Sequence, residues 1–238
     1  MCRYFSAIVT KDKILWDLDT DSHEDLIEKF KLKDTTKEPD FVRVEILPKD
    51  NNIFNHDLKN WELHKDQDLI PGWFDFKASE KEVKKVLKES FEQRFLISRS
   101  IDEIKKGRWF LKDGKVGVLK GSSVVKNMRG SSVVQNMCGS SVVQDMRGSS
   151  VVKNMCDSSV VKNMCDSSAV QDMRGSSVVK NMRGSSVVQN MCDSSVVQDM
   201  RGSSVAISRI KNKIITQNKD FKLEYWERME GEGNGNEK

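Results

Sequence analysis

A nine-residue repeat fills most of the second half of the chain, and it constrains the fold more than any other feature. From Ser122 the pattern S-S-V-V-[KQ]-[ND]-M-[RC]-[GD] runs nine times without an insertion, apart from one Ala in place of Val. Each unit combines β-branched residues with Asn or Asp and then Gly or Asp, which tolerate corners and left-handed backbone. The repeat therefore predicts short strands and corners wound into a parallel β-solenoid.

The positions that never vary within the array indicate which side chains point inward. The fourth residue, Val, and the seventh, Met, are the same in every unit, whereas the fifth and eighth change. With alternation along a strand, we expect the second Ser, the second Val and the Met to face the core. Ala169, the one break in the Val pair, falls at an outward position, as this register requires.

The number of repeats in one coil has two solutions. Two repeats make a flat coil of about 18 residues, and three make a triangular coil of about 27. Asp replaces Asn at positions 145, 172 and 199, a spacing that favours the triangle. Small Ser and Val side chains fill a thin core better than a wide one, so we expect two repeats per coil. Stacked Asn side chains at the sixth position are expected to form a structural amide ladder.

A sharp change of composition near Gly121 divides the chain. We expect an α+β domain at 1–106, a strand-and-turn cap at 107–121, the solenoid at 122–202, cap strands at 203–228 and a disordered tail at 229–238. In the first domain we expect strands at 3–9, 13–17, 41–47 and 61–64. Capping boxes that start at Ser22 and Ser79 predict two helices.

Composition and charge exclude several classes of protein. The chain has 40 Lys and Arg against 36 Asp and Glu, and the small excess lies in the repeats. This bias is well short of a dedicated nucleic-acid binder, and it argues more firmly against an acidic mimic of nucleic acid. No apolar run approaches the roughly 20 residues of a membrane span, and the N-terminus does not resemble a secretory signal. We therefore expect a cytoplasmic protein without membrane contact, whose five cysteines are free thiols.

Candidate chemistry in the first domain is sparse. The histidines show no zinc-site spacing, and the chain has no phosphate-binding or nucleophile motif. We predict no catalytic residue, no metal and no cofactor. The one alternative is a pocket in which acidic residues near two tryptophans meet a histidine for acid-base or metal work. Its candidate residues are His23, His56, Asp57, Asp66, Asp68 and Asp75.

The eighth repeat position offers a second candidate site. With two repeats per coil, four arginines stack on one side of the solenoid and three cysteines on the other. An arginine column suits phosphates or another polyanion. A thiol column suits a soft metal, but cysteines along a flat face lack tetrahedral convergence. The arginines are Arg129, Arg147, Arg183 and Arg201, and the cysteines are Cys138, Cys156 and Cys192.

Four segments of the first domain carry a resemblance to known proteins: Met1–Thr10 (MCRYFSAIVT), Trp16–Phe30, Val42–Pro48 and Asp66–Asp75. In these segments the chain resembles a loose group of uncharacterised bacterial and phage proteins, in which such a module precedes a short-repeat β-solenoid. The resemblance implies a phage or mobile-element context, hence a host-cell cytoplasm, and implies no reaction. The repeats here use Ser-Ser-Val-Val where the group often has Asn-Ala-Thr-Val.

These features favour a non-enzymatic interaction or scaffold protein whose solenoid displays repeated side chains. A protein partner or self-association fits this interpretation best. In one alternative the N-terminal module is a small enzyme or phage effector, and the solenoid is a spacer or oligomerisation stem. In another, the stacked arginines bind a polyanion or nucleic acid.

Overall fold

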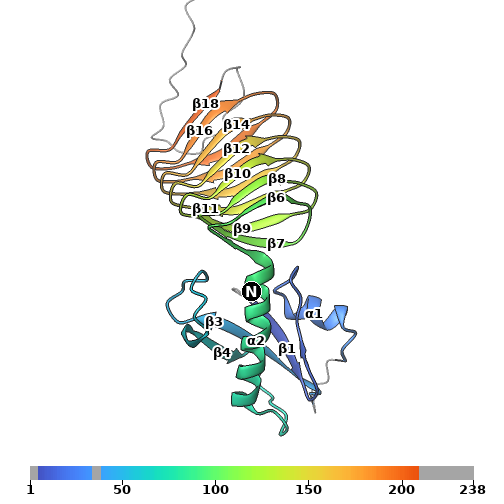
Figure 1. Ribbon diagram of the computed structural model, residues 1–238. Helices are drawn as coiled ribbons and strands as arrows, with labels where there is room; N and C mark the ends of the chain where they lie inside the picture. Colours follow the sequence, from blue (N-terminus) through green and yellow to red (C-terminus); the bar gives the residue numbers. More distant parts are fainter. Residues whose placement is uncertain (1–4, 34–38, 209–238) are drawn as a thin grey trace, which may run out of the picture.

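The computed structural model describes residues 5–33 and 39–208, and shows an N-terminal α+β region followed by a parallel β-solenoid (Figure 1). The cap strands expected beyond residue 208, the predicted tail and Cys2 lie outside the described residues. Within the described part of the chain, no helix has the length and apolar character needed to cross a membrane.

The N-terminal region is a four-stranded antiparallel sheet with a helix on each face. Ala7 and Val9 face the long helix α2, whereas Ile8 faces the short helix α1, so the sheet is buried on both sides. All four predicted strands and both helices are present. In the sheet order β2-β1-β3-β4 the strands are β2 (Ile14–Leu15), β1 (Phe5–Thr10), β3 (Phe41–Pro48) and β4 (Trp61–Lys65), and the helices are α1 (His23–Lys29) and α2 (Phe76–Arg94).

The sequence predicted a capping residue for each helix, and the prediction is correct for α1 alone. Ser22 caps α1 as predicted, because its hydroxyl accepts a hydrogen bond from the Asp25 N–H at 3.2 Å. The predicted cap of α2 at Ser79 is wrong. Asp75 caps this helix one turn earlier by accepting from the Ala78 N–H at 3.0 Å, and Ser79 is buried within the first turn. A carboxylate at this position also interacts favourably with the helix dipole, which explains the earlier start.

The solenoid consists of two seven-stranded parallel sheets, which we call the odd sheet and the even sheet after their strand numbers. Val133 pairs with Val151 in the even sheet and Val142 with Val160 in the odd sheet. Partners are therefore 18 residues apart, which confirms two repeats per coil. The repeat strands are β9 (Val124–Arg129), β10 (Val133–Met137), β11 (Val142–Met146), β12 (Val151–Met155), β13 (Val160–Met164), β14 (Ala169–Met173), β15 (Val178–Met182), β16 (Val187–Met191), β17 (Val196–Met200) and β18 (Val205–Ser208).

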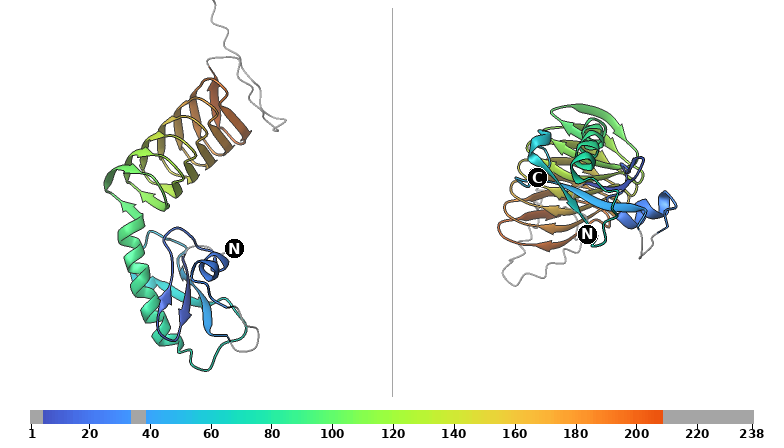
Figure 2. Two further views of the ribbon diagram at one scale, coloured as in Figure 1. Left: turned by 90° about the vertical axis from the view of Figure 1, so that its right-hand side faces the viewer. Right: turned by 90° about the horizontal axis from the view of Figure 1, so that it is seen from below.

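Both sheets start upstream of the repeat array. Strands β5 (Phe95–Ile97) and β6 (Ser100–Ile104) pair in parallel with β7 (Arg108–Lys112) and β8 (Lys115–Leu119). The chain passes directly from the C-terminal end of α2 into this first coil (Figures 1 and 2). The turn at 113–114 joins strands of opposite sheets, so it is a solenoid corner and not a hairpin.

The core of the solenoid has the predicted composition. In the repeat 158–166, for example, Ser159, Val161 and Met164 have no exposed surface, whereas Val160 is partly exposed. The same pattern recurs in every repeat, which confirms the inward and outward assignment. Each coil thus presents the same apolar layer to the next, and the layers merge into one continuous core.

The ninth residue of the repeat is Gly or Asp, and it lies at a corner of the coil where φ is positive. Gly148 has φ +69°, and Asp166, which stacks on it one coil later, has φ +58°. The Asp166 carboxylate accepts a hydrogen bond from the Gly148 N–H at 2.9 Å, and the same bond joins Asp157 to Gly139 and Asp193 to Gly175. Asp tolerates left-handed backbone better than most residues and here also binds a backbone donor, so Gly and Asp alternate without changing the corner.

The predicted side-chain ladder at the sixth position is present. Asn163 donates its amide hydrogen to Asp145 at 2.9 Å and accepts one from Asn181 at 3.0 Å. In the even sheet Asn154 donates to Asn136 at 3.0 Å in the same way. An Asp can replace Asn where it only has to accept, which accounts for the Asn and Asp variation in the repeat.

Candidate functional site

The six pocket candidates of the first domain are distributed over several places. Only His23 and Asp66 lie together. Asp57 caps a short 3-10 helix (Leu58–Asn60) by accepting from the Lys59 N–H at 3.0 Å, and Asp75 caps α2. Asp68 is exposed. Two of the candidates therefore stabilise helix ends, and His56, described below, packs against α2.

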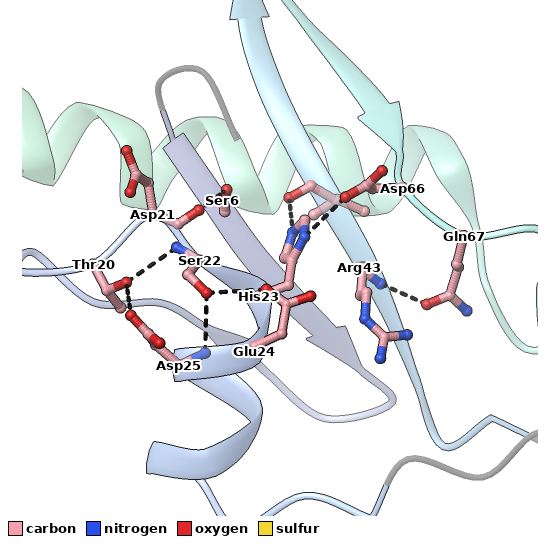
Figure 3. Close-up of polar contacts among 11 residues, drawn as sticks. Ser6, Thr20, Asp21, Ser22, His23, Glu24, Asp25, Arg43, Asp66 and Gln67 are labelled. Carbon is pink, nitrogen blue, oxygen red and sulfur yellow. Dashed lines mark hydrogen bonds and ion pairs between the residues drawn. The ribbon is translucent and has the colours of Figure 1, made fainter. Parts of the chain in front are cut away.

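His23 is the centre of a polar cluster that joins α1, β3 and the segment after β4 (Figure 3). It is the first residue of α1, and only 2% of it is exposed. Its Nδ1 lies 3.0 Å from Oδ2 of Asp66, just after β4, and its Nε2 lies 3.0 Å from the carbonyl oxygen of Val44 in β3. Glu45 also belongs to the cluster, since its carboxylate and the other two ligand atoms lie within 4.8 Å of one another.

Hydrogen bonds before α1 hold His23 in place. The Ser6 hydroxyl in β1 donates to the carbonyl oxygen of Asp21 at 2.7 Å, and the Thr20 hydroxyl donates to the Asp25 carboxylate at 2.7 Å (Figure 3). Glu24 accepts a hydrogen bond from the Ser22 hydroxyl. A hydrogen bond to its own backbone and the one from Ser22 lower the pKa of Glu24. These bonds orient the first turn of α1 toward the sheet.

A second set of bonds fixes the segment that carries Asp66. The side-chain oxygen of Gln67 accepts from the Arg43 N–H at 2.9 Å, and its amide nitrogen donates to the carbonyl oxygen of Phe41 at 3.2 Å. The Asp66 N–H donates to the carbonyl oxygen of Arg43 at 2.9 Å. The chain after β4 is thereby tied to β3, so that Asp66 faces His23.

His56 is part of the aromatic core around α2. Its ring stacks on Phe91 with centroids 3.9 Å apart and meets the edge of Phe95 at 5.0 Å. Its Nε2 is buried and has no hydrogen-bond partner among the described residues. Burial lowers the pKa of His56, and the nearby positive charge of Arg99 lowers it further. The ring therefore acts as a neutral aromatic side chain.

This environment predicts a pH dependence of stability. Because folding lowers the pKa of His56 from its ordinary 6.5, the unfolded chain takes up a proton more readily than the folded protein. The contribution of His56 to stability should be complete above about pH 6.5 and decrease as the pH falls below that value. We expect His56→Phe to keep the stack on Phe91 and to flatten the decrease in urea midpoint between about pH 6.5 and 5.

The control for this prediction is His64→Phe, which changes a histidine at an exposed position of β4. It should leave the pH dependence as it is in the unchanged protein. An identical slope in His56→Phe and the unchanged protein would contradict the assignment.

The N-terminal domain and the first coils enclose a small cavity of about 30 Å³, lined mainly by aromatic rings and by Arg94 and Arg108. This is room for about one water molecule. An open cleft of about 310 Å³ lies beside it, between residues 16–19 and the end of α2, where Arg94 pairs with Asp19 at 2.8 Å. Neither space is lined by any of the six pocket candidates.

The arginine column is present at the corners that follow the odd-numbered strands, which we call the odd edge. Arg147, Arg183 and Arg201 are exposed and follow strands stacked in one register. Arg129 differs, because it is half-buried and its guanidinium lies over the Phe54 ring at 5.7 Å. Cys165 occupies the corner between Arg147 and Arg183, so the exposed column has a gap that we did not predict.

The opposite corners form the even edge, where Arg174 interrupts the three predicted cysteines. Burial raises the pKa of Cys156 to about 12, and the neighbouring Cys138 thiol adds to this effect. The Cys156 thiol donates to the carbonyl oxygen of Met137 at 3.2 Å. The proton is therefore held on the sulfur at neutral pH, which makes Cys156 a poor nucleophile.

The two sheets also differ in charge, because alternate repeats belong to opposite sheets. Counting the charged residues of alternate repeats in the sequence would have predicted this difference. The five repeats of the odd sheet carry seven basic residues against three acidic ones, whereas the four repeats of the even sheet carry two against three. Those of the odd sheet are Lys126, Arg129, Arg147, Lys162, Lys180, Arg183, Arg201, Asp145, Asp166 and Asp199. Those of the even sheet are Lys153, Arg174, Asp157, Asp172 and Asp193.

The fold defines the class of protein: an α+β domain followed by a parallel β-solenoid with two sheets. Comparison with protein-family models, curated proteins and solved structures finds no match to this chain.

Proposed function

We propose that this protein is a non-enzymatic interaction or scaffold protein whose solenoid presents repeated side chains to a partner. The observation that carries the proposal is the in-register stacking of equivalent outward positions from β9 to β17 over a fully buried core. Such columns are already ordered before binding, so little conformational entropy is lost on association. The phage or mobile-element context implied by the resemblance belongs to the same proposal.

The N-terminal domain supports this function by covering the start of the solenoid. Phe54 packs edge-on against Phe95 of β5, with centroids 5.9 Å apart, and Asp21 pairs with Arg108 of β7 at 2.7 Å. Strand β5 is the first strand of the odd sheet, and an uncovered strand edge there would invite pairing with other chains. The two sides of the described solenoid are then surfaces that a partner can reach.

Two sets of outward substitutions test this proposal. Lys162→Glu with Lys180→Glu changes the odd sheet, and Lys153→Glu with Gln171→Glu changes the even sheet. Each set alters exposed or half-exposed positions and leaves the core intact. We expect affinity capture with the full chain to retain a partner that one set loses and the other keeps, with the same circular dichroism spectrum in all three proteins.

The opposite result would favour the enzyme or effector alternative. In that case both solenoid sets would retain the same bound components, and a substitution in the first domain, Asp66→Asn, would lose them. The dispersal of the six pocket candidates supports the interaction proposal over this alternative.

A second candidate function is polyanion binding along the odd edge. The separation of charge between the two sheets favours it, because positive charge is concentrated on one side of a rigid body. Arg183 and Arg201 lie on neighbouring coils of the odd edge, with Arg147 beyond the gap at Cys165, and arginine matches the geometry of phosphate groups.

The triple variant Arg147→Gln, Arg183→Gln and Arg201→Gln tests the polyanion function. We expect it to weaken binding of single-stranded DNA and to reduce the slope of log affinity against log salt by about 0.7 for each arginine that contacts a phosphate. Fluorescence anisotropy at several salt concentrations measures both quantities. Arg129→Gln should have little effect, because its guanidinium lies over Phe54.

The matched control is Arg174→Gln, which removes the same charge from the even edge. It should leave affinity and salt slope unchanged. Equal weakening by Arg174→Gln, or unaltered binding by the triple variant, would rule out a site on the odd edge.

A further inference from the structure

Both ring nitrogens of His23 face oxygen atoms that accept hydrogen bonds. The carbonyl oxygen of Val44 has no hydrogen to donate, so Nε2 must carry the proton in their 3.0 Å contact. In a neutral imidazole the other nitrogen, Nδ1, then has a lone pair, which faces the Asp66 carboxylate at 3.0 Å. Two lone pairs at that distance repel one another. A proton or a metal ion between the two atoms removes this repulsion.

We propose that His23, Glu45 and Asp66 bind a divalent transition-metal ion of the Zn²⁺ type. The three ligand atoms lie within 4.8 Å of one another. An ion bound at about 2.0–2.2 Å from each ligand holds them roughly 3–3.5 Å apart, so small rotations of the carboxylates complete the site. Val44 supplies the second contact typical of a metal-binding histidine, because its carbonyl fixes the tautomer that leaves Nδ1 available.

The donor atoms and their exposure define the class of ion. One imidazole nitrogen and two carboxylates suit Zn²⁺, Co²⁺ or Mn²⁺, whereas Cu⁺ prefers sulfur and Mg²⁺ prefers oxygen alone. The Asp66 side chain is 56% exposed, so an ion can enter from solvent and keep a water ligand. His23 by contrast is buried, which fixes its position before the ion arrives.

The other charged groups near the site are occupied by neighbours. Glu24 and Asp25 of α1 accept hydrogen bonds from Ser22 and Thr20, and Arg43 of β3 lies over the Phe41 ring at 5.2 Å. Asp66 faces Nδ1, and the Glu45 carboxylate belongs to the same cluster. The ion would join α1, β3 and the segment after β4, and would hold the seven-residue helix α1 on the sheet. This role is independent of display by the solenoid.

Metal titration of the full-length protein after removal of metals with a chelator tests the proposal. We expect calorimetry with Zn²⁺ and with Co²⁺ to give one high-affinity site per chain, and Mg²⁺ to give none. Bound Co²⁺ should show visible absorption without the thiolate-to-cobalt band that cysteine ligands produce. Among the described residues, Cys138, Cys156 and Asp157 are the other group that lies close enough to hold an ion, and Cys138→Ser with Cys156→Ser should leave the site intact.

Paired variants at the site complete the experiment. Asp66→Asn and Glu45→Gln should each weaken Co²⁺ binding at least about 10-fold, the lower end of the loss caused by removing even a second-shell partner. The controls Asp68→Asn and Glu62→Gln make the same charge changes at exposed neighbouring positions and should not weaken it. Absence of binding would overturn the proposal. So would a thiolate band lost in the cysteine variant, or equal weakening by the controls.

Discussion

Val161→Asp is expected to lower the free energy of unfolding by about 3–5 kcal/mol, whereas Val160→Asp should lower it by no more than about 1 kcal/mol. Val161 has no exposed surface and stacks between Val143 and Val179 of the neighbouring coils. A carboxylate there would be buried among apolar side chains without a counter-charge. Val160, one residue earlier in β13, points outward and is partly exposed.

Urea unfolding followed by circular dichroism measures the difference between these two variants. Each coil contacts mainly its neighbours, so damage to β13 should also weaken the coils on either side. A reduced dependence of the unfolding free energy on urea would show that the central coils no longer unfold together with the rest. Equal destabilisation by the two substitutions would contradict the inward and outward assignment.

Much of the solenoid was predictable because every repeat supplies the same information. The invariant Val and Met identified the core, the Gly or Asp position identified the corners, and the small side chains favoured the thin coil. The first coil was not predictable in this way. Leu96, Ile101 and Ile104 point into the same core but lack the repeat motif, and they directly follow the amphipathic helix α2. Parallel pairing with the next coil makes strands of this segment.

The polar cluster at His23 was predictable only in part. The sequence named His23 and Asp66 as candidates, but their contact depends on how α1 packs on β3 and on how Gln67 holds the chain after β4. Glu45 was missed, because in the sequence it is one polar residue of an alternating strand. Asp75 shows the converse, since its proximity to two tryptophans suggested a pocket, whereas the structure uses it as a helix cap.

The junction between the two parts of the molecule depends on Asp21. Its carboxylate lies 2.7 Å from the Arg108 guanidinium and 3.8 Å from the Lys126 ammonium group. The Arg108 side chain is only 12% exposed, and burial lowers the pKa of Arg108 while the charge of Asp21 raises it. An arginine keeps its proton in either case, so the positive charge at this junction requires a partner.

Asp21→Ala is therefore expected to lower the free energy of unfolding by about 3 kcal/mol, near the lower end of the loss caused by breaking a buried ion pair. The partial exposure of Asp21 allows water to offset some of the loss. Arg108→Leu should cost less, because it removes the charge together with the need for a partner. Asp19→Ala breaks the more exposed pair with Arg94 and should cost no more than about 1 kcal/mol.

Hydrogen exchange of residues 16–21 and of β7 locates the effect, and size-exclusion chromatography shows its consequence. If the N-terminal domain covers the first strands of the solenoid, Asp21→Ala should speed exchange in both segments and promote concentration-dependent self-association. Asp19→Ala should do neither. Faster exchange without self-association would mean that the start of the solenoid resists pairing by itself, and the domain would then have to be explained by a role other than capping.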